Sequence, residues 1–341
     1  MKSLVLIGSN SVHLKNYKEL ISSEFENIEV ISNCSTSDFT VNHSFDFSFR
    51  VKSVILTPWR IRKVLKSYKP DVIHIHQSNS YAFYTVLASF FLSIPCVLTC
   101  WGSDILLLPK KNYFFRWMIK FILNKVDYIT ADAEFVGKEI EKYLAKSTPI
   151  LIANFGIIQN QNQLPKEKII YSNRLHKPLY RVDLLIRAFA LFVKKHPEWK
   201  LVVGAVGEET DNLKKLVKEL DIPNVSFIGW VDREVNFTNY AKASFWVSIP
   251  ESDATAISLL EAMDAGCVPI VSDLPANREW IQQLDNGYIV TDLTSDFFSE
   301  ALQIDLVKAK AQNVQLIIQK ATKEVNKQKF VQLYSTLISH A

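Results

Sequence analysis

Residues 250–280 read PESDATAISLLEAMDAGCVPIVSDLPANREW, and they carry the clearest pattern in the chain. The stretch starts at the end of an apolar strand and continues through a loop of small residues into the first turns of a helix. A second strand and a loop follow. Two carboxylates, Asp253 and Glu261, are separated by seven residues, among which are the small and hydroxylic residues of the loop.

The loop between these carboxylates predicts an anion site. A loop of small side chains exposes backbone N–H groups at the start of a helix, where the helix dipole favours an anion such as a diphosphate. The amides expected to hold it are those of Thr255, Ala256, Ile257 and Ser258. The flanking carboxylates can accept hydrogen bonds from hydroxyl groups. A sugar nucleotide is a ligand that carries both a diphosphate and several hydroxyls.

The same stretch resembles the donor-binding motif of glycosyltransferase family 4, whose members are retaining enzymes with the GT-B fold. The family pattern is Glu-x7-Glu followed by Ala-Met, and Glu261 stands at the second Glu, ahead of Ala262 and Met263. Asp253 stands at the first acidic position and is shorter than the usual Glu. Residues 266–273 also match the family. The alternative is a buried α/β unit in which Glu261 caps a helix.

Length and composition suit a two-domain protein without a strong charge preference. A chain of 341 residues is long enough for two domains of ordinary size. The formal net charge of +4 is too small to indicate a nucleic-acid partner. The hydrophobic fraction of 48% and the mean hydropathy of +0.06 are high, and they suggest a surface that meets something apolar.

The sequence predicts a cytoplasmic protein, with peripheral binding at the inner face of the membrane as an option. The apolar run Leu4–Ile7 is too short for a signal peptide. Residues 72–103 carry no charge, but Pro95 divides them, and each piece is too short to span a bilayer. The four cysteines lack C-x-x-C spacing, which favours buried thiols in a reducing compartment.

Strands alternate with helical patterns along the whole chain, which predicts α/β architecture with doubly wound parallel sheets. The predicted strands are Ser3–Ile7, Glu29–Ile31, Val72–His76, Val97–Thr99, Tyr128–Ala131, Ile150–Ala153, Ile169–Ser172, Lys200–Val203, Ser226–Ile228, Phe245–Ser248, Pro269–Val271 and Tyr288–Val290. Ligands of such sheets bind outside the carboxyl ends of the strands.

The polar segment 159–168 is the best linker candidate. It separates an N-terminal, acceptor-side Rossmann-like domain (residues 1–158) from a nucleotide-sugar-binding Rossmann-like domain (residues 169–308). Residues 309–341 form a C-terminal tail that is helical by pattern. The GT-B resemblance implies an interdomain cleft that holds the ligands, and last helices that cross back to the N-terminal domain.

Arg174 follows a predicted strand, where a phosphate ligand is expected. It matches the Arg of the family stretch Gly-Arg-Leu…Lys-Gly, in which Arg and Lys neutralise the donor diphosphate. An Arg there can bind phosphate with two hydrogen bonds and stabilise the leaving group. The family Lys has no clean counterpart, because Leu179 or Tyr180 falls at its place. Arg181 and Lys177 are nearby substitutes. A surface Arg beside a turn is the alternative for Arg174, and for Arg181 it is the simpler interpretation.

Two further loops of the second half resemble nucleotide contacts of the family. Gly204 and Gly207, in the sequence GAVG, follow a predicted strand and resemble the glycine loop that lets backbone approach the nucleotide. Trp230 follows the next strand, where the family contacts the nucleotide base. A core position for Trp230 is equally compatible with the sequence.

Two loops of the first half resemble the acceptor side. Asp104 follows a Gly-Ser pair, as in the family's His-Gly-x-Asp loop that faces the transferred sugar, and Trp101 stands where the family often has His. Asp104 is a candidate for hydroxyl contacts or positioning, with an N-cap role as the alternative. The resemblance places the first βα loop, with Gly8 and His13, over the diphosphate and the acceptor. His13 is a candidate acceptor contact or proton carrier, or simply an exposed loop residue.

The sequence predicts no required metal. His74 and His76 share one face of a strand, as a metal pair would, but no third ligand is evident, and buried histidines are the simpler interpretation. No Asp-x-Asp triplet occurs anywhere in the chain. Its absence fits a GT-B enzyme rather than the metal-dependent GT-A class.

Residues 110–125, KKNYFFRWMIKFILNK, combine five basic residues with aromatic ones and contain no acidic residue. A helix of this composition suits an anionic membrane surface. A buried helix whose Lys and Arg side chains reach out to solvent is the alternative. In the first case the acceptor is expected to be a lipid-linked sugar at the cytoplasmic face.

The combined prediction is a retaining glycosyltransferase that moves a hexose-type sugar from a nucleotide diphospho-sugar to a glycan or lipid-linked acceptor. UDP-sugar is the most frequent donor of the family, and surface polysaccharide or glycolipid synthesis is the expected role. Glu261 is expected to hold the ribose, Asp253 the sugar hydroxyls, and Arg174 the diphosphate. Open alternatives are a GT-B epimerase, a phosphorylase, and a non-catalytic two-lobed sugar-binding protein.

Overall fold

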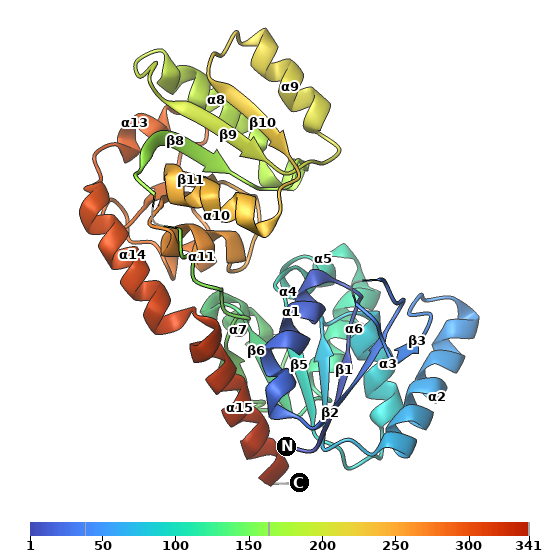
Figure 1. Cartoon of the computed structure of the whole chain (residues 1–341). Helices are drawn as coiled ribbons and strands as arrows, with labels where there is room; N and C mark the ends of the chain where they lie inside the picture. The colour runs from blue at the N-terminus through green and yellow to red at the C-terminus, as the bar shows by residue number, and fades with distance from the viewer. Residues whose placement is uncertain (38, 163, 340–341) are drawn as a thin grey trace. The chain divides into compact units, whose positions relative to one another are not determined.

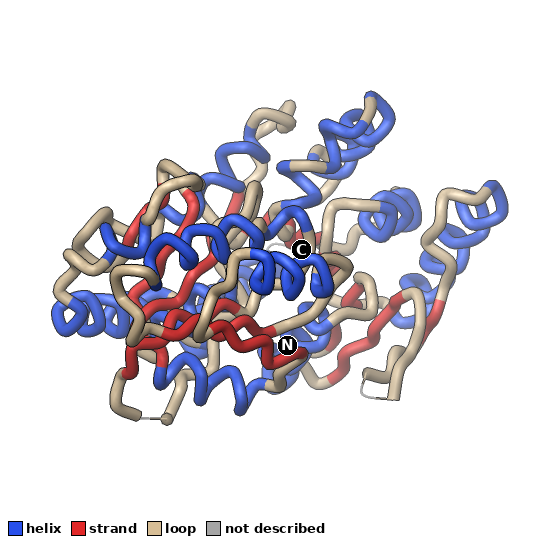
Figure 2. Tube along the Cα trace, turned by 90° about the horizontal axis from the view of Figure 1, so that it is seen from above, coloured by secondary structure: helices blue, strands red, loops and turns tan. Residues whose placement is uncertain are grey.

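The chain folds into two compact units. The computed structural model describes residues 1–37, 39–162 and 164–339. The first unit comprises Met1–Gly156 together with the last helix from Lys323 onward, and the second comprises Ile157–Thr322 (Figure 1). Figure 2, with strands in red and helices in blue, shows sheets with helices packed against them. None of the helices in the described ranges is both long and apolar enough to cross a bilayer.

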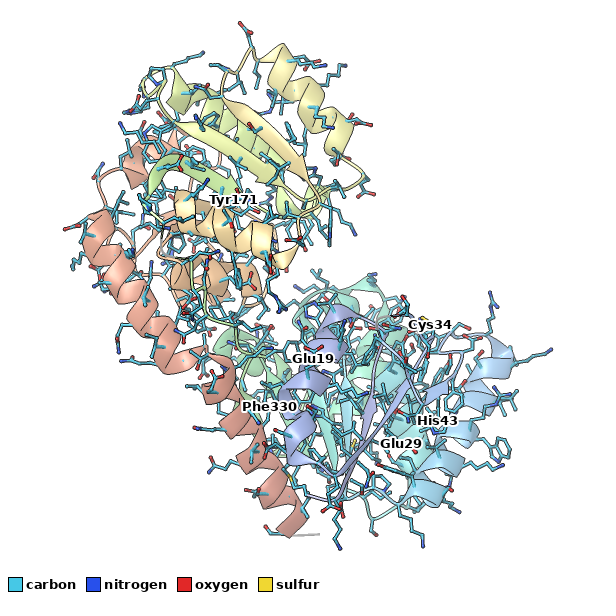
Figure 3. All side chains as sticks on the ribbon, viewed as in Figure 1. Glu19, Glu29, Cys34, His43, Tyr171 and Phe330 are labelled. Carbon is cyan, nitrogen blue, oxygen red and sulfur yellow. The ribbon has the colours of Figure 1, made fainter. Side chains whose placement is uncertain are left out.

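The first unit is built on a parallel sheet, which in the described residues has seven strands in the order β3-β2-β1-β4-β5-β6-β7. These strands are β1 (Ser3–Ile7), β2 (Asn27–Ser32), β3 (His43–Ser44), β4 (Val72–His76), β5 (Cys96–Cys100), β6 (Tyr128–Ala131) and β7 (Ile150–Ile152). The central strands β1, β4 and β5 are fully or almost fully buried, as apolar strands covered on both faces should be. At the β2–β3 edge, His43 Nε2 lies 2.8 Å from Glu29 Oε2; both residues are labelled in Figure 3.

Helices cover this sheet and complete its core. They are α1 (Val12–Ile21), α2 (Val51–Tyr68), α3 (Ser80–Ser89), α4 (Ser103–Leu106), α5 (Leu108–Lys111), α6 (Tyr113–Leu123), α7 (Glu134–Glu141) and α15 (Lys323–Ser339). The last helix, α15, packs against α1 and β4, although both lie far from it in the sequence. Its Phe330, labelled in Figure 3, is fully buried in the same core cluster as Leu14 and Tyr17.

A buried hydrogen-bond network also holds α15 in place. The Tyr334 hydroxyl lies 2.6 Å from the Tyr17 hydroxyl and 2.5 Å from His74 Nδ1. The other ring nitrogen of His74 lies 2.7 Å from Thr99 Oγ1, which in turn lies 2.7 Å from Thr130 Oγ1. Burial lowers the pKa of His74 to about 3, so the ring is neutral at pH 7. The network thus ties the end of the chain to β4, β5 and β6.

The second unit repeats the same architecture. In the described residues its parallel sheet has six strands in the order β10-β9-β8-β11-β12-β13. They are β8 (Glu167–Ser172), β9 (Lys200–Gly204), β10 (Val225–Gly229), β11 (Ala243–Ser248), β12 (Val268–Ser272) and β13 (Tyr288–Val290). The helices are α8 (Val182–Val193), α9 (Thr210–Glu219), α10 (Arg233–Lys242), α11 (Ile257–Asp264), α12 (Pro275–Arg278), α13 (Phe297–Ala301) and α14 (Leu306–Lys320).

Both sheets reverse their strand order at one point. In the first unit, β1 lies between β2 and β4, so the winding changes direction between β1 and β4. In the second unit the change lies between β8 and β11. The loops that follow these strands diverge, and such a reversal point is where doubly wound sheets bind ligands. In the second unit these loops carry Arg174 and residues 250–256.

The predicted doubly wound α/β fold is confirmed, and each predicted strand is present with ends that differ by two residues or fewer. The short strand β3 was not predicted, because two residues show no periodicity. The chain passes between the units at Gly156 and again at Thr322. Segment 159–168 lies in the second unit, where the Asn160 amide donates to Asp264 at 2.6 Å. Helix α14 packs on α11, and α15 alone joins the first unit.

Two local predictions are wrong. The expected helix over residues 110–125 is interrupted, because Asn112 caps a new helix by accepting a hydrogen bond from the Phe115 amide at 3.0 Å. The structure therefore has α5 and α6 in its place. Of the four cysteines, three are buried as expected, but Cys34 is exposed.

The buried network of α15 predicts a stability change. Replacing Tyr334→Phe removes the hydroxyl that joins Tyr17 and His74 and leaves both without this partner. We expect a loss of about 1–3 kcal/mol in the free energy of unfolding, measured by urea denaturation. Thr336→Ala, at an exposed position of the same helix, is the control and should change stability by less than about 0.5 kcal/mol. Equal stability of Tyr334→Phe and the unmodified chain would contradict an anchoring role for the network.

Candidate functional site

The second unit brings three predicted site residues together at its strand-order reversal. Arg174, two residues beyond β8, donates from Nη2 to Asp253 Oδ2 at 2.6 Å and from Nη1 to Ser258 Oγ at 3.0 Å. Asp253 lies in the loop after β11, and Ser258 is in the first turn of α11. The face of Tyr180 lies 4.4 Å from the guanidinium carbon of Arg174. The guanidinium is thereby held between an aromatic ring, a carboxylate and a helix N-terminus.

This arrangement has the electrostatics of an anion site. Helix α11 begins after Ala256, which provides no side-chain cap, so its first N–H groups are available to an anion, and the helix dipole favours negative charge there. The Arg174 side chain is 12% exposed, and its buried Nε has no hydrogen-bond partner among the described residues. A guanidinium and a helix N-terminus therefore contribute positive potential at the same point.

Asp253 supplies the negative charge in this structure. Its side chain is 25% exposed, and burial raises its pKa while the neighbouring Arg174 acts in the opposite direction. Its Oδ1 also accepts a hydrogen bond from the Ala254 amide at 3.1 Å. The carboxylate is thus oriented by two donors at the start of the loop that leads to α11.

Glu261 lies one turn further along α11, on a different hydrogen-bond network. Its Oε2 accepts from the Tyr240 hydroxyl at 3.3 Å. That hydroxyl accepts from Asn173 Nδ2 at 2.7 Å, and Asn173 Oδ1 accepts from Trp246 Nε1 at 3.0 Å. Burial raises the pKa of Glu261 to about 7. Its carboxyl group therefore changes charge near neutral pH.

Sequence analysis missed the residues that position Glu261. Asn173 and Tyr240 are joined to Tyr171 through Asn236, whose Oδ1 accepts from the Tyr171 hydroxyl at 2.6 Å and from Asn173 Nδ2 at 3.1 Å. Tyr171, labelled in Figure 3, is fully buried in β8. Asn173 was adjacent to Arg174 in a recognised motif, which is the signal that could have identified it. Tyr240 and Asn236 lie on α10, and nothing in their local sequence indicated a role.

The glycine loop after β9 has a packing explanation. A Cβ at Gly207 would lie 2.3 Å from the His176 carbonyl oxygen, and one at Gly204 would lie 3.1 Å from the Tyr171 hydroxyl. Gly207 is therefore required by the close approach of the His176 backbone. Trp230, beyond the positive-φ residue Gly229, is 72% exposed, so the core interpretation of this residue is wrong.

Arg181 and Lys177, the substitutes for the missing family Lys, border a pocket that is also lined by His176, Asp183 and Glu209. Arg181 adopts a positive φ of 51° and lies 3.9 Å from Glu251. Lys177 is exposed. Within the described residues, the ion pair of Arg181 is with Glu251, whereas that of Arg174 is with Asp253.

In the first unit, Asp104 has a positioning role. Its two carboxylate oxygens accept from the backbone amides of Ser78, at 2.6 Å, and Trp101, at 3.0 Å. The residue is 3% exposed, and burial raises its pKa to about 6. Asp104 thus joins the loop after β4 to the loop after β5. The N-cap of α4 is Gly102 and Asp104 lies inside the first turn, so the N-cap alternative for Asp104 is wrong.

An aromatic cluster lies beside this loop. The ring of His13, an exposed residue of α1, is centred 4.8 Å from Trp101 and 6.0 Å from Phe155. His76 is fully buried, and burial lowers its pKa well below the ordinary value. Gly8 lies against it, since a Cβ at Gly8 would be 3.1 Å from His76 Cβ. The cluster is therefore neutral and largely aromatic.

Some polar atoms of this cluster are buried without hydrogen-bond partners among the described residues. They are both ring nitrogens of His76, Ser78 Oγ and Trp101 Nε1. Buried polar groups are nearly always paired with protein or with a small polar molecule. The ends of β4 and β5 therefore retain hydrogen-bonding capacity for a ligand. Within the described ranges, no group of three or more His, Cys, Asp or Glu residues is placed to hold a metal ion.

Two family models match separate parts of the chain. The model described as glycosyl transferases group 1 matches residues 155–323. The model described as glycosyl transferase 4-like matches residues 3–133. Together they cover the described elements of both units except α7, β7 and α15.

Individual relatives agree with these matches. The chain is 32% identical over 241 residues to an uncharacterized glycosyltransferase of Haemophilus influenzae, which covers 67% of this chain and 65% of that protein. It is 26% identical over 247 residues to the O-antigen biosynthesis glycosyltransferase WbnH of Escherichia coli, covering 71% and 69%. The matches thus span about two thirds of the length of these relatives.

A solved structure shows the same fold over almost the entire chain. Anabaena HepE, crystallised in complex with UDP-glucose, superimposes with a TM-score of 0.80 over 98% of this chain and 99% of that one, at 11% sequence identity. With the two family models and the pair of parallel sheets, the conclusion is that the chain belongs to the glycosyl transferases of group 1, the family 4 type with the GT-B fold.

Proposed function

We propose that this protein is a retaining glycosyltransferase that transfers a hexose-type sugar from a nucleotide diphospho-sugar to a glycan or lipid-linked acceptor. One observation carries the proposal: Arg174 lies against the uncapped N-terminus of α11 and pairs with Asp253, and Glu261 follows one turn further along the same helix. Positive potential beside carboxylates that can accept hydrogen bonds from hydroxyls fits a sugar diphosphate better than it fits most other metabolites.

In the proposed complex, the N-terminal amides of α11 and Arg174 bind the diphosphate. The anion then replaces Asp253 as the principal partner of the guanidinium. Asp253 turns to hydroxyls of the donor sugar, and Glu261 accepts hydrogen bonds from the ribose. The exposed ring of Trp230 offers a stacking surface for the base.

The chemistry requires a stabilised leaving group. The acceptor hydroxyl attacks the anomeric carbon as the bond from that carbon to the diphosphate breaks, and the acceptor proton passes to the departing phosphate oxygen. Arg174 stabilises the negative charge that develops on this phosphate. Attack on the face from which the diphosphate leaves retains the anomeric configuration. His13, Trp101 and Asp104 are proposed as acceptor-side residues, and Gly8 of the first βα loop is proposed to lie over the donor diphosphate.

UDP is the proposed nucleotide, because HepE, with the same fold, was crystallised with UDP-glucose. A glycan or lipid-linked acceptor is proposed because WbnH is named for O-antigen biosynthesis. The role in surface polysaccharide or glycolipid synthesis rests on the same relative. An epimerase would release nucleotide without acceptor, and a phosphorylase would bind inorganic phosphate in preference to any nucleotide.

Thermal unfolding with UDP, GDP and ADP tests the donor site. A nucleotide at about 100 times its dissociation constant should stabilise the protein by about 2.7 kcal/mol. We expect this shift with UDP, and we expect Glu261→Ala to weaken it by removing the ribose acceptor. Glu141→Ala, at an exposed position of α7, is the matched control and should leave the shift unchanged. If no nucleotide stabilises the protein while inorganic phosphate does, the phosphorylase interpretation replaces this one.

The raised pKa of Glu261 predicts pH-dependent donor binding. With a pKa of about 7, the carboxyl group is mostly protonated at pH 6 and mostly ionised at pH 8, and only the ionised form accepts from two ribose hydroxyls. UDP-glucose, whose diphosphate does not titrate in this range, should bind about tenfold more tightly at pH 8 than at pH 6. Titration calorimetry measures the difference, which Glu261→Gln should abolish.

The same pKa shift makes a separate prediction for stability. Because the folded-state pKa of Glu261 is raised, its contribution to stability is fully present below pH 4.5 and is lost as the pH rises through 7. Glu261→Gln should therefore be more stable than the unmodified protein at pH 8, by at most about 3 kcal/mol, and should lose that advantage at pH 5. A pH-independent difference between the two proteins would show that Glu261 titrates normally.

Asp253 is expected to distinguish the sugar from the nucleotide. Asp253→Asn removes the charge that pairs with Arg174 but keeps the size of the side chain. UDP affinity should be unchanged or higher, because the guanidinium loses a competing carboxylate. Affinity for UDP-glucose, UDP-galactose or UDP-N-acetylglucosamine, whichever binds best, should fall by about tenfold through loss of a charged hydrogen bond. An equal fall in UDP affinity would place Asp253 at the diphosphate instead.

A further inference from the structure

The first unit carries an apolar face whose aromatic side chains are exposed. Helix α3 packs between α2 and α6, and the three helices can be followed in Figure 1. The exposed large apolar residues of this region are Phe49, Val51, Val54, Ile55, Leu56, Trp59, Phe90, Phe91, Tyr113, Phe114 and Trp117. Trp59 and Trp117 are 60% and 55% exposed, and Tyr113 is 89% exposed. We call this surface the α2–α6 face.

Ring contacts make the face continuous. Phe49, just before α2, has its ring centre 5.5 Å from that of Phe114 on α6. Phe83 of α3 lies 6.1 Å from Trp117 and 5.8 Å from Phe121. Phe49 just before α2 and the exposed rings of α6 therefore belong to one surface, while Trp59 lies further along α2 with Lys63 over its ring.

The charge of this region has one sign. Residues 49–69 contain seven Lys or Arg, residues 107–125 contain five, and neither segment contains Asp or Glu. The formal net charge of the chain is +4, so the rest of the chain is negative by eight. Two of these cations contact residues of the α2–α6 face. Arg62 donates to the carbonyl oxygens of Ala88 and Phe90, and Lys125 lies 5.0 Å from the centre of the Phe90 ring.

We propose that the α2–α6 face docks the protein onto an anionic lipid bilayer. Exposed Trp and Tyr rings surrounded by Lys and Arg match the interfacial region of a membrane, where such rings sit at the headgroup level and the cations meet anionic lipids. A second copy of the chain fits less well, because two such faces would bring like charges together. The inference goes beyond the proposed transfer reaction and does not depend on the donor site.

This face extends the membrane prediction made for residues 110–125. The earlier alternative, a buried helix, applies to one side of α6, where Met118, Ile119, Ile122 and Leu123 are buried. The opposite side carries Tyr113, Phe114 and Trp117 in exposed positions. Helix α2 adds a second amphipathic element, since Ser53, Thr57, Ile61 and Leu65 are its buried residues while Ile55 and Trp59 are exposed.

Vesicle sedimentation of the full chain tests the proposal. Vesicles of phosphatidylcholine alone are compared with vesicles that contain about one third phosphatidylglycerol, at low and high salt. We expect binding to the anionic vesicles and a marked weakening at high salt, because screening shortens the range of the attraction. Equal binding to neutral vesicles, or none to anionic vesicles at low salt, would overturn the proposal.

Paired charge reversals locate the surface. Each Lys near an anionic surface contributes about fivefold in affinity, so Lys63→Glu with Lys66→Glu should lower the partition coefficient by about 30-fold or more. Lys214→Glu with Lys218→Glu, at exposed positions of α9 in the second unit, makes the same change in net charge. This control should lower the partition coefficient by less than about twofold. Equal loss in both variants would show that net charge, and not this face, controls binding.

Removal of two exposed tryptophan rings tests the apolar contribution to membrane binding. Trp59→Ser with Trp117→Ser should weaken binding to anionic vesicles at least tenfold, while the thermal shift with UDP stays as in the unmodified protein. That second measurement confirms the fold and separates failure of membrane docking from failure of the donor site. If the unmodified protein is instead a dimer by sedimentation velocity, and these substitutions dissociate it without changing vesicle binding, the face is an interface between copies and the proposal is wrong.

Discussion

The Arg174 guanidinium lies against the positive end of α11, and this contact determines how the rest of the candidate site is arranged. A mostly buried cation beside a helix N-terminus is unfavourable unless negative charge compensates it. In this structure Asp253 provides that charge at 2.6 Å. A diphosphate would provide more of it, and it would use the α11 amides as well. The Arg174–Asp253 pair can therefore be understood as the arrangement that keeps Arg174 positioned for an anion.

Glu261 experiences a different environment although it lies on the same helix. Among the described residues its hydrogen-bond partner is the buried Tyr240 hydroxyl. Burial raises its pKa to about 7, although this hydroxyl and the charge of Arg233 act in the opposite direction. Arg174 acts on Asp253 in the opposite direction. The two carboxylates, eight positions apart, thus differ in their partners, which are a guanidinium for Asp253 and a tyrosine hydroxyl for Glu261.

The sequence predicted the parallel sheets well, because each strand is a short apolar run with its own boundaries. It also brought Arg174 and residues 253–261 to one edge, since carboxyl ends of parallel strands share an edge. It could not predict the Asn173–Tyr240–Glu261 network, because these side chains come from three elements and meet only in the folded core. It could not reveal that the His176 backbone gives Gly207 a packing reason, and the role of Gly207 beside the nucleotide stays a prediction. The exposed apolar side of α2 was missed because it is visible only after the buried side of this helix is known.

The carboxyl-end edges of the two sheets differ in chemistry, although the two sheets have the same winding. The edge between β8 and β11 carries Arg174, Asp253 and Glu261, all of them ionisable groups in partly buried positions. The edge after β4 and β5 carries His76 and Trp101, which are neutral groups with unused hydrogen-bonding atoms. Charged groups suit a diphosphate, whereas neutral polar atoms beside aromatic rings suit hydroxyls and the apolar faces of sugar rings. These residues support the proposal that the second unit stabilises the leaving group and that the first unit binds the uncharged acceptor.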